Sequence, residues 1–269
     1  MTEPTARVLL DSISPKGNRL TTLEVVMHRF VLAEFNTHRV FSRNSASSRA
    51  IPVKKQMERV RTDPALPLSW PAEQKGMQGG AELTGVARQY AIETWLDARD
   101  SALRHAETLL NFKVHKSVVN RLLEPFMWHT VIVSSTNWQG FWDQRCSLLA
   151  QPEIHAAADA MHDAYSHSTP DEVAWGEWHM PLIEDTELRE CSVFNYDPRH
   201  ISAARCARVS YLTHDGQRSY DADQELFDRL STAEPPHASP LEHVATPSAM
   251  FWQQGNFDGW RQLRHEVFA

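Results

Sequence analysis

The longest regular pattern in the chain runs through residues 83–110 and constrains the fold most. Apolar residues recur there at spacings of three and four, as they do along the buried stripe of an amphipathic helix. The segment 20–32 (LTTLEVVMHRFVL) differs, because its β-branched and apolar residues predict a strand that leads into an apolar helical turn. A strand and a long helix in one chain favour an α/β (α+β) fold. The apolar positions of the helical segment are Val86, Ala87, Tyr90, Ala91, Trp95, Leu103, Ala106 and Leu110.

Further helices are predicted on both sides of the middle of the chain. Residues 114–138 begin with a helical pattern, which Pro125 is expected to kink or restart. Asp197 followed by Pro198 has the form of an N-cap and a first helical residue, so a helix is expected to begin there. Two more amphipathic segments predict helices over 151–165 and 221–232.

Two segments lack such periodicity. Residues 63–80 are punctuated by proline and glycine and predict a loop. Residues 170–190 hold seven acidic residues and one basic residue, which is typical of an exposed connector. We therefore expect a single domain of residues 1–269, built from a first part (1–168), an acidic connector (169–196) and a last part (197–269).

The charge balance narrows the class of partner. The chain has 269 residues and a formal net charge of -7, which disfavours a general nucleic-acid or membrane-surface binder. The three cysteines, Cys146, Cys191 and Cys206, have no paired spacing, which predicts a reducing compartment and neither disulfides nor a metal site. Residues 1–17 lack the apolar core of a secretion signal, and no apolar run is as long as a membrane span. We expect a cytoplasmic protein.

A short basic stretch, residues 36–52 (NTHRVFSRNSASSRAIP), stands out on this acidic chain. It gathers three arginines, one histidine and four serines, and no glycine. Arginine forks match phosphate and carboxylate oxygens, and serine hydroxyls complete such cradles. A basic pocket on an acidic protein favours a small anionic ligand. The alternative is a solvated loop whose arginines form surface ion pairs.

Four other segments hold polar residues in apolar surroundings, and each has a plainer interpretation. Arg121 in NRLLEPF lies among apolar residues, either extended along a helix end or paired with a buried group. Asn137 and Arg145 lie in NWQGFWDQRCSLLAQPEI, which alone predicts only a helix end with aromatic anchors. His243 in SPLEHVATP lies before a strand, where hydrogen-bonded packing is the plainer role. Residues 204–211 (ARCARVSY) form a small-residue helix face.

The common catalytic patterns do not occur. The sequence holds no glycine-rich phosphate loop, no nucleophile-elbow serine, no metal-spaced histidine pair, and no cysteine beside a histidine base. From the residues alone, the chain is an anion-binding α/β enzyme or binding protein.

Taken together, these segments resemble the flavin-dependent thymidylate synthases, also called thymidylate synthase complementing proteins. That family's signature is Arg-His-Arg, seven residues, then Ser, continuing to Arg; here it stands as Thr37-His38-Arg39, seven residues, Ser47, then Arg49. NRLLEP, FWDQRCSLLAQPEI, ARVSY and SPLEH resemble four further motifs of the family. The last two follow the signature here and precede it in the family, which indicates a circular permutation.

The resemblance implies a fold, a reaction and a set of site residues. The fold would be a mixed or antiparallel sheet flanked by helices, in a homotetramer with active sites between subunits. The reaction would be reductive methylation of dUMP to dTMP with FAD, NADPH and methylenetetrahydrofolate, without a cysteine nucleophile. Arg145 would hold a uracil carbonyl and stabilise charge as C5 becomes nucleophilic, with His243 near the flavin ring. FAD would contact His38, Arg39, Asn137, Ser210 and His243, and the phosphate of dUMP would contact Ser47, Ser48, Arg49 and, from another subunit, Arg121.

Several positions depart from the family pattern and leave alternatives open. Thr37 replaces an arginine, Ser45 a glutamate, Ala50 an aromatic residue, and Glu34 stands where a glutamine would help with dUMP. A changed charge balance at an anion site changes what binds there. One alternative is a flavin- and folate-dependent pyrimidine hydroxymethylase or other C5-modifying enzyme, of the sort a phage uses for altered DNA bases. The other is a non-catalytic nucleotide-binding homologue.

Overall fold

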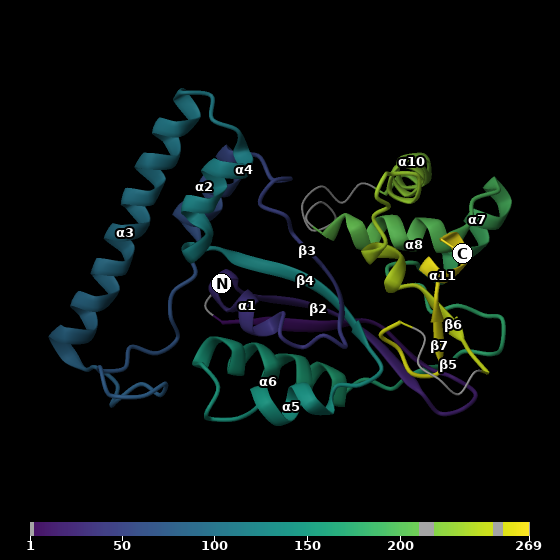
Figure 1. The fold of residues 1–269 in the computed structure, drawn as a ribbon, viewed down its shortest axis with the longest axis horizontal. Helices are drawn as coiled ribbons and strands as arrows, with labels where there is room; N and C mark the ends of the chain where they lie inside the picture. The colour runs from purple at the N-terminus through teal and green to yellow at the C-terminus, as the bar shows by residue number, and fades with distance from the viewer. Residues whose placement is uncertain (1–2, 210–217, 250–254, 269) are drawn as a thin grey trace.

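The computed structural model describes residues 3–209, 218–249 and 255–268. Its centre is a five-stranded mixed sheet in the order β3-β4-β2-β1-β5, antiparallel except for the parallel pair β1 and β5 (Figure 1). Helices flank the sheet, so the predicted α/β (α+β) class is confirmed. The strands are β1 (Thr5–Ile13), β2 (Arg19–His28), β3 (Ser42–Ser45), β4 (Trp128–Ser135) and β5 (Asp171–Glu172).

One face of the sheet is apolar and packs on helices α5 (Gln139–Arg145) and α6 (Pro152–Ser166), which lie below the sheet in Figure 1. Alternate residues of β2, namely Leu23, Val25 and Met27, are fully buried in this core, because side chains two apart on a strand share a face. The predicted strand at 20–32 and the helix at 151–165 are therefore confirmed.

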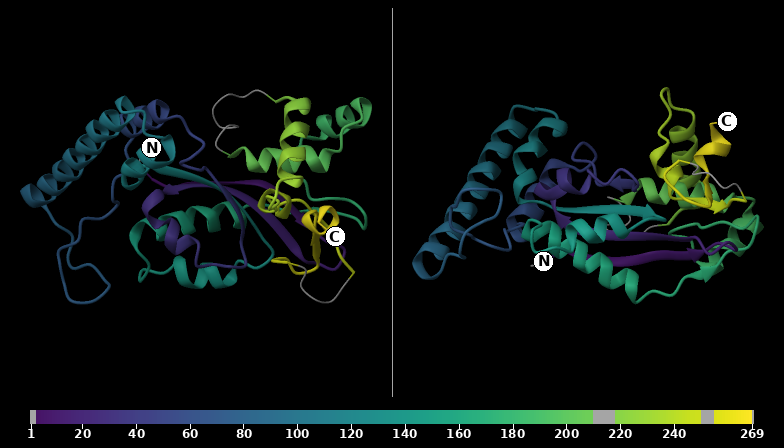
Figure 2. Two further views of the ribbon diagram at one scale, coloured as in Figure 1. Left: turned by 45° about the horizontal axis from the view of Figure 1, so that its top comes forward. Right: turned by 60° about the horizontal axis from the view of Figure 1, so that its bottom comes forward.

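The opposite face is covered less evenly. Thr22 Oγ1 lies 2.8 Å from Nε2 of the buried His179, and Nε2 of His28 donates a 2.7 Å hydrogen bond to the Leu66 carbonyl oxygen near the other end. Between them, Glu24 and Val26 are partly buried. Figure 2 shows the same arrangement, with helical structure at each end of the sheet.

The prediction for residues 114–138 was wrong after Pro125. The short helix α4 (Lys116–Val119) leads into η2 (Asn120–Phe126), which ends one residue after that proline, and β4 follows as a strand instead of a restarted helix. The segment WHTVIVSS is rich in β-branched residues and pairs with β2 on one side and β3 on the other. The hydrogen bonds that this segment forms with two neighbouring strands outweigh its local preference for continuing the helix.

A helical arm extends from one end of the sheet. It consists of α2 (Val53–Thr62), the predicted long helix α3 (Gly85–Asn111) and the predicted loop at 63–80, and α3 stands farthest from the sheet (Figures 1 and 2). Only the C-terminal half of α3 contributes to a core: Leu103 and Ala106 are buried in a second core, whereas Val86 and Tyr90 in the N-terminal half are 85% and 71% exposed. The apolar stripe of α3 is thus only partly buried within one chain.

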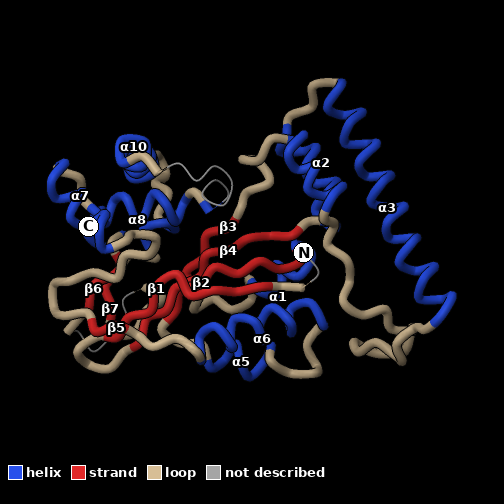
Figure 3. The backbone as a smooth tube through the Cα atoms, turned by 180° about the vertical axis from the view of Figure 1, so that it is seen from behind, coloured by secondary structure: helices blue, strands red, loops and turns tan. Residues whose placement is uncertain are grey.

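The C-terminal lobe covers the other end of the sheet, as seen from behind in Figure 3. Asn44 of β3 donates to the Cys206 carbonyl oxygen, and Ser42 donates to Glu242, so the lobe is tied to the sheet edge. The predicted helices after Pro198 and over 221–232 are confirmed. The elements are α7 (Asp185–Phe194), α8 (Pro198–Ala207), α10 (Tyr220–Ser231), η3 (Ser239–Glu242), β6 (Ala245–Pro247), β7 (Trp260–Gln262) and α11 (Arg264–Val267).

The acidic segment is more structured than an exposed connector. His179 is fully buried and pairs through its backbone with Ala245, and Glu187 of α7 is buried as well. Glu184 and Glu187 form a capping box at the start of α7, so these acids have local partners in the fold. The prediction of exposure holds for most of the segment and fails at these anchoring residues, because charge composition does not show which acids find partners. No helix among the described residues is long and apolar enough to cross a membrane.

Candidate active site

Arg145, at the end of α5, brings three parts of the predicted site together. Its Nε donates to Nε2 of His38 at 3.0 Å, and its Nη2 donates to Oγ1 of Thr37 at 3.1 Å and to the Glu34 carbonyl oxygen at 3.3 Å. These contacts join residues more than one hundred positions apart in the sequence. The resemblance assigns His38 to the flavin and Arg145 to the uracil ring, and the geometry places these two side chains in direct contact.

His38 is neutral in this arrangement. Burial, followed by the charges of Arg145 and Arg43, lowers the pKa of His38 to about 4. Because Nε2 accepts the Arg145 hydrogen bond, the ring proton is on Nδ1. Arg43 donates to the His38 carbonyl oxygen at 2.8 Å, which fixes the turn between α1 (Leu32–Phe35) and β3. Arg43 is therefore a structural arginine within the basic stretch.

Arg145 and Glu34 line a pocket of about 770 Å³. The loop at 67–79 and residues 149–154 form its walls, with Phe30 and Trp95 among the aromatic lining. The carboxylate oxygen Oε2 of Glu34 is buried and has no hydrogen-bond partner among the residues that the structure describes. Within those residues Nη1 of Arg145 also makes no hydrogen bond, so this pocket presents one acceptor and one donor group to a ligand.

A second cluster forms around Glu124 in η2. Its Oε1 accepts hydrogen bonds from Ser48 Oγ at 2.5 Å, Arg121 Nη1 at 2.7 Å and Arg29 Nη2 at 3.3 Å. Two of the residues predicted to bind phosphate, Ser48 and Arg121, thus lie together within one chain. Arg29, Arg121 and Glu124 line a second, open pocket of about 460 Å³.

The remaining residues of the signature lie on the surface. Ser47 and Arg49 are exposed, and the backbone N–H of Arg49 donates to Ser47 Oγ at 3.3 Å. Arg39 and Asn137 are also exposed, and the side chains of both make no hydrogen bond or ion pair within the described part of the chain. These four side chains are accessible to a ligand or to another subunit.

His243 lies in a buried row of hydrogen bonds that crosses the sheet. Its Nδ1 is 2.7 Å from Ser134 Oγ, which is 2.6 Å from Thr22 Oγ1. Thr22 Oγ1 is in turn 2.8 Å from Nε2 of His179, whose Nδ1 is 2.8 Å from Ser12 Oγ. The other ring nitrogen of His243, Nε2, is buried without a partner among the described residues. His243 lines neither the pocket of Arg145 nor that of Arg121 as these are formed by the described residues.

Comparison with known proteins decides the family. The family model of thymidylate synthase complementing protein matches residues 19–171, more than half of the chain. The chain belongs to this family. The matched range contains the Thr37–Arg49 signature, Arg121 and Arg145, and ends before ARVSY and SPLEH. No curated protein matches the chain.

Two crystal structures are similar in fold to this family member. Both are of the UMP/dUMP methylase PolB from Streptomyces cacaoi, one bound with 5-Br dUMP and the other with 5-Br UMP. The first is 14% identical, covers 62% of this chain and 91% of its own, and has a TM-score of 0.48. The second is also 14% identical, covers 62% and 90%, and has a TM-score of 0.49.

Family membership did not reveal every residue of the two clusters. Glu124 and Arg29 were missed, although Glu124 is part of the quoted NRLLEP motif, where an acid three positions after Arg121 is a visible signal for an ion pair. His179 was missed because it lies in the acidic segment with no local pattern around it. Ser210, predicted to contact the flavin, lies outside the described residues.

The cysteines of this family member are poorly suited to act as nucleophiles. Burial, then a hydrogen bond with Asp159 and its charge, raises the pKa of Cys146 to about 12. Burial also raises the pKa of Cys191 and of Cys206. Because the thiolate is the reactive form, these thiols are unreactive near neutral pH.

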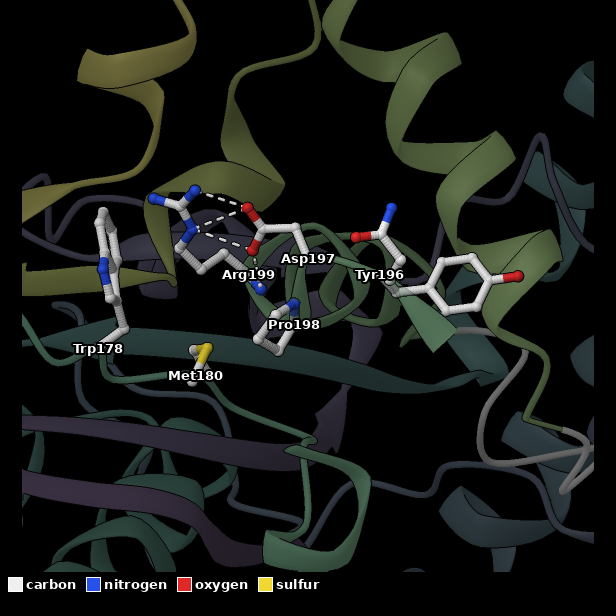
Figure 4. Close-up of a pocket in the computed structure, with 7 residues that line it drawn as sticks. Trp178, Met180, Tyr196, Asp197, Pro198 and Arg199 are labelled. Atoms are coloured by element: carbon white, nitrogen blue, oxygen red, sulfur yellow. Dashed lines mark hydrogen bonds and ion pairs between the residues drawn. The ribbon is translucent and has the colours of Figure 1, made fainter. Parts of the chain in front are cut away.

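A further hollow, of about 480 Å³, lies on the C-terminal lobe beside Arg199 (Figure 4). Asp197 binds the Arg199 guanidinium, Glu266 accepts from its Nη1 at 3.1 Å, and the indole of Trp178 lies 4.9 Å from it. Two carboxylates already neutralise this arginine, so the hollow does not have the character of an anion site.

Proposed function

We propose that the protein is an FAD-dependent enzyme that methylates dUMP to dTMP, with methylenetetrahydrofolate as carbon donor and NADPH as reductant. The observation that carries the proposal is the meeting of Thr37, His38 and Arg145 beside one pocket in a member of this family. The reduced flavin would supply the hydride that ends on the pyrimidine. The high pKa of Cys146 supports chemistry without a cysteine nucleophile.

Arg145 would bind and polarise the base. Three hydrogen bonds fix its guanidinium, so Nη1 is held in place before the substrate arrives. A donor fixed beside a uracil carbonyl oxygen stabilises the negative charge that develops as C5 becomes nucleophilic. The pocket walls around it would exclude water from the ring.

The donors that FAD requires fit the residues present. Arg39 and Asn137 have exposed side chains that form no hydrogen bond or ion pair with the described residues, which suits a diphosphate and a ribose. His38 offers Nδ1–H, and Nε2 of His243 has no hydrogen-bond partner in the part of the chain that the structure describes. We assign these four residues and Ser210 to the flavin, with His243 nearest the ring.

The phosphate of dUMP would be bound by Ser47, Ser48, Arg49 and Arg121. Ser47 and Arg49 are exposed, and Ser48 and Arg121 meet at Glu124. The pocket of Arg145 and the pocket of Arg121 and Glu124 share Phe30 as a lining residue, and complete sites would form where subunits of a homotetramer meet. The exposed apolar residues Val86 and Tyr90 of α3 support an interface.

We also propose that the chain is one domain whose segment 197–269 corresponds to the start of the usual family order. The lobe that contains ARVSY and SPLEH packs on β3, next to the signature. A circular permutation leaves such contacts in place while it changes the order of the segments.

The test is an absorbance spectrum of the purified protein followed by turnover. We expect a yellow preparation that, with dUMP, methylenetetrahydrofolate and NADPH, gives a product of the mass of dTMP. Arg145→Gln should lower kcat about 100-fold or more, whereas Arg229→Gln, on the exposed surface of α10, should leave it unchanged. A colourless protein that takes up no FAD would support the non-catalytic alternative, and a hydroxymethyl product would replace the proposed reaction.

A further inference from the structure

Three donors from separate segments converge on one oxygen atom of Glu124. Oε1 accepts from Ser48 Oγ, from Arg121 Nη1 and from Arg29 Nη2, whereas Oε2 accepts no hydrogen bond from the described residues. Three charge-assisted or hydroxyl donors around one oxygen form the arrangement that binds an oxyanion. In this chain a carboxylate oxygen occupies it.

The donors are fixed independently of Glu124. Nη1 of Arg29 is 3.1 Å from Nε2 of His129, and burial followed by the Arg29 charge lowers the pKa of His129 to about 3, so the ring is a neutral acceptor. The carbonyl oxygen of Ser48 accepts from Asn120 Nδ2 at 2.7 Å. Two of the three donors would therefore keep their positions if the carboxylate left.

The cluster is open on the side of Arg121. The Arg121 side chain is 54% exposed, and Glu124 is 21% exposed beside the 460 Å³ pocket. A carboxylate with this access to solvent can exchange its donors with an incoming anion. A phosphate monoester carries more charge than a carboxylate and offers three oxygens, so it can bind Arg29, Arg121 and Ser48 at once.

We propose that Glu124 is a specificity-determining residue that competes with the substrate phosphate for Ser48 and Arg121. In the free chain its carboxylate holds both donors, and a phosphate monoester displaces it. Every anion that needs these donors must displace the carboxylate, so Glu124 lowers all their affinities by the same factor and leaves unbound the weak anions, which bind too poorly to occupy the site. This inference rests on the proposed function for the identity of the nucleotide, but not for the binding of phosphate itself.

The experiment compares Glu124→Gln with Glu58→Gln. Both changes remove one negative charge, but Glu58 lies on the exposed surface of α2, where it pairs with Arg61. Glutamine keeps the volume and loses the charge that holds the arginines. We expect dUMP, measured by calorimetry, to bind about tenfold more tightly or better to Glu124→Gln than to the natural chain, with no change for Glu58→Gln and none for deoxyuridine, which lacks the phosphate.

Inorganic phosphate and chloride separate this inference from the proposed function. If the natural chain binds no nucleotide, the proposed function fails, and tighter binding of phosphate alone by Glu124→Gln still supports the competition. Phosphate should gain at least as much affinity as chloride from the change, because both displace the same carboxylate and the removed charge repels a dianion more. Equal or weaker phosphate binding by a Glu124→Gln variant that melts at the same temperature as the natural chain would overturn the inference.

If Glu124→Gln fails to fold, Glu124→Asp provides the same comparison, because its shorter carboxylate reaches Ser48 less well. We expect phosphate to bind this variant more tightly than the natural chain. An unchanged phosphate affinity would then overturn the inference.

Discussion

Two arginine–carboxylate clusters in this protein use the same chemistry in opposite surroundings. In the C-terminal lobe, Arg205 of α8 is fully buried and binds Glu187 and Asp223. In the basic region, Arg121 and Arg29 bind Glu124 at the edge of an open pocket. The first cluster leaves little room for a ligand, and the second leaves its outer arginine in contact with solvent.

The buried arginine, Arg205, forms more hydrogen bonds with the described residues than the exposed arginine, Arg121. Arg205 donates to both oxygens of Glu187 at 2.8 Å, to Asp223 at 3.0 Å and to the Leu182 carbonyl oxygen at 2.8 Å. Burial alone would lower the pKa of Arg205, but these hydrogen bonds and charges hold it above its usual value. Among the described residues Arg121 makes one ion pair, with Glu124. A buried charge must be paired and hydrogen-bonded within the fold, whereas an exposed charge is solvated by water and stays available to bind a ligand.

Breaking the buried cluster should have the largest effect. Arg205→Met keeps much of the side-chain volume but leaves the buried carboxylates of Glu187 and Asp223 without their cation. Removing one partner of a buried ion pair destabilises a protein by about 3–5 kcal/mol. Urea unfolding of the purified variant measures the loss. A loss below about 1 kcal/mol would mean that this cluster behaves like a surface pair and that burial does not distinguish the two.

The buried histidines of the row across the sheet should give a smaller, pH-dependent effect. Burial lowers the pKa of His179 and of His243 to about 3, below the 6.5 expected in the unfolded chain. Between these values the unfolded chain binds protons that the folded chain does not, so stability is full above pH 6.5 and is lost as the pH falls. Each histidine contributes a slope of about 1.4 kcal/mol per pH unit in this window.

Replacing one of these histidines isolates its share of that slope. His179→Gln removes one titrating group, so unfolding free energies measured between pH 6.5 and 5 should fall less steeply than in the natural chain. The slope is independent of any constant loss of stability that the change brings. An unchanged slope would show that His179 is already protonated in the fold.

The smallest effect on stability is expected at the open cluster. Arg121→Ala should change the free energy of unfolding by less than about 1 kcal/mol, because half-exposed ion pairs contribute little. The same change should weaken the binding of dUMP, since Arg121 is proposed to contact its phosphate. Chemical unfolding and calorimetry on one preparation give both values. A large loss of stability with unchanged binding would assign Arg121 to the fold and remove it from the site.

Local sequence was a good guide wherever a single element decided the outcome. The Asp197 cap, the strand at 20–32 and the long helix all follow from side chains that are neighbours in the sequence. The error at β4 has a different origin, because the strand exists through pairing with β2 and β3, which are distant in the chain. No window of sequence around Pro125 contains that information.

The site shows the same division. The resemblance to the family singled out His38 and Arg145, which the structure places 3.0 Å apart. The sequence gave no sign that Glu124 also binds Ser48 and Arg29, or that His179 and His243 belong to one buried row of hydrogen bonds. These contacts join side chains from 76 to more than one hundred positions apart.

The sequence by itself determined the residue types available, the helix and strand patterns, and the signature that marks the family. Only the tertiary structure decided which arginines are satisfied by the protein and which remain open to an anion. The physical reason is that the strength and availability of a charge depend on burial and on the groups within hydrogen-bonding distance. Both are properties of the folded chain, because folding brings together residues that the sequence keeps apart.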